Sequence, residues 1–204
     1  FEKVVAVVNE LNQYEYACVE QSSSKLLGLL LKARIQKKLL IKEKNNRDIY
    51  NMLSRMADLQ NTNGSFGWWR KNGTNDRLTI YAMEVCYMAL KEGYTNNVYN
   101  AAKDYIVQHY SELNESDKIY AYNVLLNAGI SVSHVHVDYL KIKPDFLTTT
   151  DKIYFYQNKL KMKDTVSPKD LYAVLLEINQ KAARPYYDNF FYDGRADLFK
   201  AYSL

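Results

Sequence analysis

Apolar residues recur along most of this 204-residue chain at intervals of three and four, the spacing that places side chains on one face of an α-helix. The segments with apolar residues at positions i, i+3, i+4 and i+7 are 4–11, 26–33, 49–56, 78–85, 98–105, 121–128 and 171–178. No segment of similar length alternates between apolar and polar residues as a strand would, and the run 134–137 alternates only briefly. The pattern therefore predicts an all-α protein.

One helical segment is repeated in a weaker form. The sequence Asp-Lys-Ile-Tyr-x-Tyr occurs at Asp117–Tyr122 and again at Asp151–Tyr156. Short links between such helices imply antiparallel hairpins, and several of the predicted helices carry apolar residues on more than one face, as helices packed on both sides do. We therefore expect an α/α toroid of antiparallel helical hairpins that forms one domain over residues 1–204.

Composition supports a globular helical chain. It is 48% hydrophobic and 25% charged, and its 19 tyrosines contrast with only 7 glycines and 3 prolines. The net charge of +4 comes from 27 basic and 23 acidic residues, a balance that argues against a nucleic-acid partner. The basic run at 32–44 is expected to be a solvated helix end.

The termini and cysteines say little about targeting or disulfides. Residue 1 is Phe, and we find no signal peptide and no apolar run of membrane length, which is typical of a domain excised from a larger protein. Two cysteines do not form a disulfide framework, and Cys86 lies in an apolar helical run where a core thiol is expected.

Candidate chemistry lies at Cys18 and Gln21, which stand three residues apart before a leucine-rich segment. On a helix start, residues at i and i+3 are neighbours, so the Cys18 sulfur can reach the Gln21 side-chain carbonyl. Attack of a thiolate there would expel ammonia and leave an internal thioester, with helix N–H groups available for the oxyanion. The alternative is an ordinary buried cysteine on a helix.

The residues around this pair resemble the thioester motif of the alpha-2-macroglobulin and complement family. Bacterial members carry Tyr-Pro-Tyr-Gly-Cys-x-Glu-Gln, commonly followed by a serine and a basic residue. Glu15 and Ala17 stand here in place of the proline and the glycine. The matching residues are Tyr14, Tyr16, Cys18, Glu20, Gln21, Ser24 and Lys25.

A second stretch carries the same resemblance. Bacterial macroglobulin thioester domains contain a glutamine, a Gly-Phe-Gly-Trp run and a Leu-Thr-x-Tyr-Ala helix in this order. We predict that the loop, with Phe66, Trp68 and Trp69, is structural and that the Trp68 ring is buried between helices. The residues that match this order are Gln60, Gly64, Phe66, Gly67, Trp68, Leu78, Thr79, Tyr81 and Ala82.

The resemblance implies roles for the motif residues. Cys18 would supply the thiol and Gln21 the acyl carbon, and Glu20 would polarise or orient the site. Tyr14 and Tyr16 would shield the bond from water beside the small Ala17. No cofactor and no metal ion is implied.

For the whole protein, the resemblance implies a bacterial host-defence protease inhibitor rather than an enzyme. Proteolytic cleavage elsewhere in the parent chain would expose the thioester, which then acylates an amine or hydroxyl of the attacking protease. The remaining macroglobulin domains of the parent chain would be partners, and the location would be extracytoplasmic, periplasmic or at the cell envelope. Domains of this family are longer, so final helices are expected to be missing or reduced.

The sequence leaves two other functions and one question of mechanism open. A toroidal enzyme such as a terpene cyclase or prenyltransferase needs an acidic metal-binding cluster or a zinc site, and no such motif occurs in the sequence. A helical interaction module with an inactive thioester motif is compatible with Glu15 and Ala17. In vertebrate relatives a downstream histidine, placed after a glycine-phenylalanine turn and just ahead of a helix, assists acyl transfer. The nearest equivalent turn here, Asn63–Trp69, holds no histidine, so we expect direct attack by amines rather than help from His134. His134 and His136 are expected to be solvated loop residues.

Overall fold

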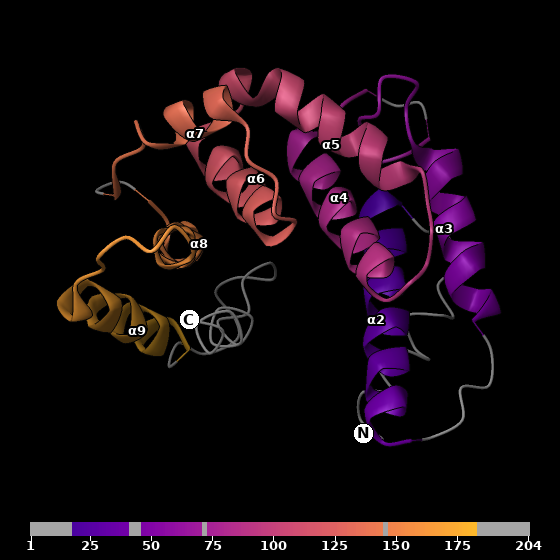
Figure 1. Ribbon diagram of the computed structural model, residues 1–204, viewed down its shortest axis with the longest axis horizontal. Coiled ribbons are helices and arrows are strands. Elements are labelled where there is room, and N and C mark those ends of the chain that lie inside the picture. Colours follow the sequence, from indigo (N-terminus) through magenta and orange to yellow (C-terminus); the bar gives the residue numbers. More distant parts are fainter. Residues whose placement is uncertain (1–17, 41–45, 71–72, 145–146, 183–204) are drawn as a thin grey trace. The chain divides into compact units, whose positions relative to one another are not determined.

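The computed structural model describes residues 18–40, 46–70, 73–144 and 147–182, and all regular elements within these ranges are helical. They comprise eight α-helices and one 3-10 helix (Figure 1). The all-α prediction is confirmed for this part of the chain. The predicted helix at 4–11 lies outside the described residues.

The chain divides into two compact units, Phe1–Leu113 and Asn114–Leu204. The described elements of the first unit are α2 (Val19–Lys38), α3 (Arg47–Leu59), α4 (Asp76–Lys91), α5 (Val98–His109) and η1 (Tyr110–Glu112). Those of the second unit are α6 (Glu115–Asn127), α7 (Ser133–Tyr139), α8 (Thr149–Lys161) and α9 (Pro168–Ala182).

Antiparallel hairpins build the first unit. The start of α2 meets the end of α3, where Arg55 Nε donates a hydrogen bond to Ser22 Oγ at 3.3 Å. Likewise, the end of α5 returns to the start of α4, where the Tyr105 hydroxyl donates to Asp76 Oδ1 at 3.1 Å. Helices joined by short links pack in this way because consecutive elements are usually neighbours in space.

Helices α2 and α4 pack side by side and run in the same direction (Figure 1). Near their N-terminal ends, the hydroxyls of Ser24 and Tyr81 are 3.0 Å apart. Near their C-terminal ends, Arg34 forms an ion pair with Glu92 at 3.8 Å. Helices α2 and α4 therefore form a parallel pair. Each also packs against the helix that follows it in the chain, α3 or α5, in an antiparallel hairpin.

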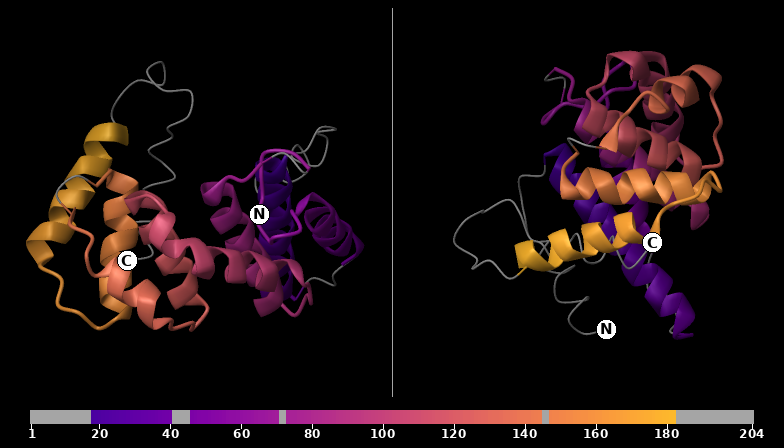
Figure 2. Two further views of the ribbon diagram at one scale, coloured as in Figure 1. Left: turned by 90° about the horizontal axis from the view of Figure 1, so that it is seen from above. Right: turned by 90° about the vertical axis from the view of Figure 1, so that its left-hand side faces the viewer.

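In the second unit, the repeated sequence packs against itself. At the starts of α6 and α8, the Ser116 hydroxyl donates to Asp151 Oδ1 at 2.6 Å. One turn further along, the rings of Tyr120 and Tyr154 stack with centroids 5.0 Å apart. The two copies thus lie in register on parallel helices, and α9 lies beside α8 (Figure 2).

The prediction of a loop around the two histidines is wrong. Both belong to α7, which buries Val135 and Tyr139 on one side. His134 is exposed, whereas His136 Nδ1 is 2.5 Å from the Tyr122 hydroxyl. A seven-residue helix is too short to show a clear helical period, so its brief alternation gave a misleading signal.

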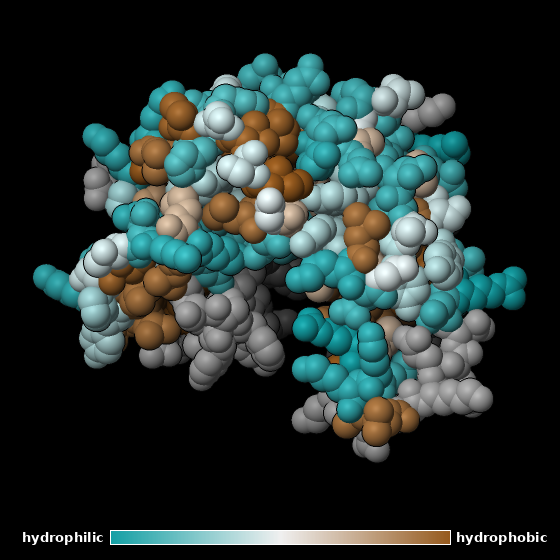
Figure 3. Space-filling model, in the orientation of Figure 1, coloured by the Kyte–Doolittle hydropathy of each residue, from teal (hydrophilic) through white to brown (hydrophobic). Residues whose placement is uncertain are grey.

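Helix α9 is apolar on more than one face, as several of the predicted helices are. Val174 and Ile178 are buried against Ile153 of α8. Leu175 and Leu176 instead reach the surface, with 43% and 42% of their area exposed, and apolar patches lie among polar residues in the region of this helix in Figure 3. Two apolar faces suit a helix that packs on both sides.

Cys86 is a core thiol, as predicted. It is wholly buried in α4, and burial raises the pKa of this thiol from 9.0 to about 12. The thiol is therefore protonated and inert at neutral pH, because the thiolate is the reactive form.

This pKa predicts an alkaline loss of stability. The folded pKa lies above the unfolded one, so the contribution of Cys86 is fully present below pH 9.0 and is lost as the pH rises to about 12. We expect the free energy of unfolding of Cys86→Ala to fall less steeply over this range than that of the wild type. Urea unfolding at several pH values measures both slopes, and equal slopes would contradict the prediction.

Candidate functional site

The first turn of α2 brings Cys18 and Gln21 together through two reciprocal hydrogen bonds. Cys18 is the N-cap residue, and its Sγ accepts a hydrogen bond from the Gln21 backbone N–H at 3.5 Å. The Gln21 side-chain oxygen Oε1 in turn accepts from the Cys18 backbone N–H at 3.2 Å. This is a capping box, in which each side chain satisfies a free N–H group at the helix start.

The arrangement favours chemistry between the two side chains. Within a single helical turn, each side chain reaches the backbone N–H of the other residue. The Cys18 N–H points at the oxygen that would carry negative charge if the Gln21 carbonyl were attacked. A donor already in place at that oxygen needs no rearrangement when the charge develops.

Burial sets the solvent access of this turn. Cys18 is 6% exposed and Val19 is wholly buried, whereas Gln21 is half-buried and Glu20 is exposed. The Glu20 carboxylate lies in the first turn, where the helix dipole favours negative charge. The thiol is therefore largely shielded from water, while the adjacent carboxylate faces solvent.

The glycine-rich loop supports this helix start directly. The Val19 backbone N–H donates to the Trp68 carbonyl at 3.0 Å. The loop in turn docks on α4, because the Phe66 N–H donates to Thr79 Oγ1 at 2.9 Å. The second stretch of the sequence resemblance therefore lies against the first, although some fifty residues separate them along the chain.

Gly64 allows the loop to approach α5 closely. Its φ angle is +89°, and a Cβ atom built there would lie 2.2 Å from the Ala101 carbonyl oxygen. Gln60 fixes the same region, because its Nε2 donates to the carbonyls of Gly64 and Val98 at 2.9 and 3.0 Å. Only glycine meets both the conformation and the space at this position.

The aromatic residues of the loop differ from the prediction in one respect. Phe66 is wholly buried, so it anchors the loop in the core. Trp68 and Trp69 are 49% and 50% exposed, so the expected burial of the Trp68 ring between helices is wrong. The Trp68 carbonyl, rather than its ring, makes the described contact with α2.

Neighbouring helices complete the surroundings of the turn. The Tyr81 hydroxyl of α4 contacts Ser24, and Arg55 of α3 contacts Ser22. Burial raises the pKa of Tyr81, the hydrogen bond with Ser24 lowers it, and the carboxylates of Glu84 and Glu20 raise it further. No sequence pattern indicated Arg55, which contacts Ser22 only because α3 folds back along α2. The predicted site residues Tyr14, Tyr16 and Ala17 lie outside the described residues.

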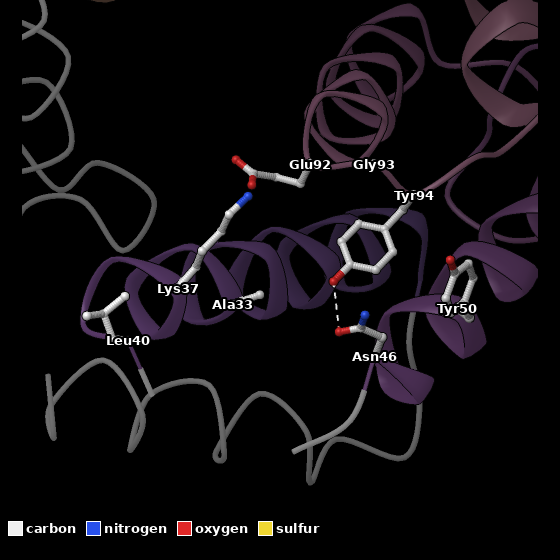
Figure 4. Close-up of a pocket in the computed structure, with 8 residues that line it drawn as sticks. All are labelled: Ala33, Lys37, Leu40, Asn46, Tyr50, Glu92, Gly93 and Tyr94. Carbon is white, nitrogen blue, oxygen red and sulfur yellow. Dashed lines mark hydrogen bonds between the residues drawn. The ribbon is translucent and has the colours of Figure 1, made fainter. Parts of the chain in front are cut away.

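A pocket of about 500 Å³ lies at the opposite end of α2 (Figure 4). Lys37 extends toward Glu92 across it, and the Tyr94 hydroxyl donates to Asn46 Oδ1 at 3.0 Å. Helix α2 has 20 residues and is therefore about 30 Å long, so this pocket is separate from Cys18. Within the described ranges, no group of three or more His, Cys, Asp or Glu side chains could hold a metal ion.

Comparison with known proteins points to one group. No protein-family model matches the chain. It is 34% identical over 98 residues to alpha-2-macroglobulin of Escherichia coli, a match over 45% of this chain and 6% of that protein. It is 28% identical over 105 residues to alpha-2-macroglobulin of Thermotoga maritima, covering 50% of this chain and 7% of that protein.

Solved structures agree with these sequence matches. A crystal structure of native Escherichia coli alpha-2-macroglobulin, from domain MG7 to the C-terminus, matches 92% of this chain and 32% of that chain, with a TM-score of 0.65 and 21% identity. Salmonella alpha-2-macroglobulin reacted with methylamine matches 90% of this chain and 13% of that chain, with a TM-score of 0.66 and 19% identity.

This chain is similar to the bacterial alpha-2-macroglobulins. The helical fold that it shares with the bacterial macroglobulins fits the predicted α/α toroid of antiparallel hairpins. The chain spans only 6 to 7% of the length of the curated relatives that it matches. Among the described residues, we find no helix that could serve as a transmembrane span.

Proposed function

We propose that Cys18 and Gln21 of this alpha-2-macroglobulin-like chain form an internal thioester that acylates an attacking nucleophile. In the forming step, the Cys18 sulfur bonds to the side-chain carbonyl carbon of Gln21. The bond from that carbon to Nε2 breaks, and ammonia leaves with the thiol proton. The observation that carries the proposal is the reciprocal pair of hydrogen bonds between these two residues.

Three features of the site support this chemistry. The Cys18 N–H donates to the Gln21 oxygen and is placed to stabilise the oxyanion of the tetrahedral intermediate. Burial of Cys18 limits hydrolysis of a bond that water would attack. The two side chains are already neighbours, which lowers the entropic cost of closing the ring.

The product-forming step transfers the acyl group to a nucleophile. An amine nitrogen bonds to the carbonyl carbon, the carbon–sulfur bond breaks, and the amine proton passes to the Cys18 thiolate. Direct attack by amines, such as lysine side chains, is proposed in preference to help from His134. Glu20, exposed beside Gln21, would orient the site, and Tyr14 and Tyr16 would shield the bond.

In the parent protein, this reaction would make the chain the covalent element of a protease trap. A relative has been crystallised after activation by trypsin, which suits a trigger by proteolysis. The chain would act as the thioester-containing domain of a protease inhibitor, not as an enzyme. Its partners would be captured proteases and the remaining macroglobulin domains, in an extracytoplasmic location at the cell envelope or in the periplasm.

The state of Cys18 tests the proposal. Freshly purified wild-type chain should show a mass lower by one ammonia and should resist a thiol reagent in its native state, because Cys18 is acylated and Cys86 is buried. Methylamine should then free the Cys18 thiol and leave a methylamide on Gln21, as peptide mass spectrometry would show.

Two results would contradict this expectation. Full labelling of Cys18 before methylamine, at unshifted mass, would favour a helical interaction module with an inactive motif. Labelling after methylamine without a methylamide on Gln21 would place the reactive carbonyl at another residue.

A further inference from the structure

Three consecutive serines follow the Cys18–Gln21 turn, and each is bonded to a different side chain. Ser22 accepts a hydrogen bond from Arg55 Nε at 3.3 Å, and the Ser23 hydroxyl donates to Met56 Sδ at 3.8 Å. Both of these serines are wholly buried. The third of these side-chain hydrogen bonds, which we call ties because they join α2 to a neighbouring helix, lies between the hydroxyls of Ser24 and Tyr81. It connects α2 to α4 rather than to α3.

These ties fix the rotation of α2 about its axis. Successive residues of an α-helix point about 100° apart, so contacts from three neighbouring positions constrain rotation in more than one direction. Buried hydroxyls are costly unless they are hydrogen-bonded, so a rotation that broke the contacts of Ser22 and Ser23 would be unfavourable. Ser22 and Ser23 hold the side of the helix that faces α3, and Ser24 holds the side that faces α4.

Ser24 is the serine closest to the acyl-bearing side chain on the helix surface. It follows Gln21 by three residues, and residues at i and i+3 are neighbours on one face. A small rotation of this face would move the Gln21 carbonyl relative to the Cys18 sulfur. Reactions between positioned groups are sensitive to such shifts, and a displacement of about 1 Å can cost on the order of a hundredfold in rate.

We infer that Tyr81 is a positioning residue for the reaction between Cys18 and Gln21, acting through its hydrogen bond with Ser24. The inference rests on the proposed thioester and adds a residue that lies 57 positions beyond Ser24 in the chain. Loss of the Tyr81 hydroxyl leaves the ring in place between the helices but releases the second turn of α2. The Gln21 side chain is then held over Cys18 only part of the time.

Tyr81 suits this role because it remains a neutral hydrogen-bonding group. Burial and the carboxylates of Glu84 and Glu20 raise its pKa, against the opposite effect of the hydrogen bond with Ser24. The tie therefore persists across the neutral pH range.

The rate of ring closure in the newly made 204-residue chain tests the inference. Cell-free synthesis followed by timed mass measurement records the loss of ammonia. Tyr81→Phe and Ser24→Ala should each slow closure by about tenfold, as expected for loss of one orienting hydrogen bond. The double variant should be no slower than either single variant, because both remove the same tie. Ser24→Thr, which retains a hydroxyl, should restore most of the rate.

Tyr87→Phe is the matched control. It removes a hydroxyl from the same helix, where the Tyr87 ring packs on Tyr99 with centroids 5.4 Å apart. This variant should close at the wild-type rate, and its melting temperature should change about as much as that of Tyr81→Phe. A difference in closure rate at similar stability separates positioning from folding.

Each remaining outcome has a definite meaning. Closure of Tyr81→Phe at the wild-type rate would overturn the inference and leave the thioester proposal intact, and so would equal slowing of Tyr81→Phe and Tyr87→Phe. If Tyr81→Phe has a much lower melting temperature than Tyr87→Phe, the closure rate of Ser24→Ala is compared with that of Tyr87→Phe instead. A wild-type chain that never loses ammonia would overturn the thioester proposal, and the role of Tyr81 with it.

Discussion

Replacing Cys18 by serine should abolish covalent capture of methylamine and leave the melting temperature close to that of the wild type. A serine hydroxyl is a better N-cap acceptor than a thiol, so the capping box with Gln21 is retained. The same hydroxyl is a poor nucleophile without a base to activate it, whereas a cysteine is partly ionised at neutral pH. Radiolabelled methylamine and thermal unfolding measure the two effects separately.

Three further variants make this result specific. Cys18→Ala should also abolish capture but lose about 1 kcal/mol of stability, because it removes the cap. Gln21→Glu should abolish capture because a carboxylate is not attacked by a thiolate, while its side chain can still accept from the Cys18 N–H. Cys86→Ala should capture methylamine normally. Capture by Cys18→Ser would show that the nucleophile is a different residue.

Replacing Phe66 by alanine should have the largest effect on stability, at about 3–5 kcal/mol. The Phe66 side chain is wholly buried, and the loop that it anchors supplies the carbonyl that holds Val19 at the start of α2. Trp68→Ala should cost only about 1 kcal/mol, because half of that side chain already faces solvent. Urea unfolding of the two variants gives both values.

The fraction of chains that close the thioester, measured in the same two variants, tests how the loop supports the site. Phe66→Ala should reduce the fraction of chains that close the thioester, since α2 loses its neighbour at the N-cap. Trp68→Ala should leave that fraction nearly unchanged, because the backbone carbonyl remains. A larger loss of stability in Trp68→Ala than in Phe66→Ala would contradict the roles assigned to these two rings.

Local sequence determined most of the helices. The spacing of apolar residues depends only on the geometry of a single helix, so the segments 49–56, 78–85 and 121–128 could be placed from sequence. The apolar spacing failed to predict α7, because a seven-residue helix contains too few apolar positions to show a period. The pairing of Cys18 with Gln21 was also predictable, since it depends on a spacing within one turn.

Only the tertiary structure decided which residues from other segments complete the site. Aromatic composition does not show which ring is buried, so Phe66 and Trp68 could be distinguished only by the path of the loop. The contacts of Ser22 with Arg55 and of Ser24 with Tyr81 join positions 33 and 57 residues apart. Such contacts depend on the directions in which α3 and α4 pack against α2, and no local pattern records those directions. The sequence by itself therefore determined where the reactive pair lies, and the packing of the helices determined which neighbours hold it in place.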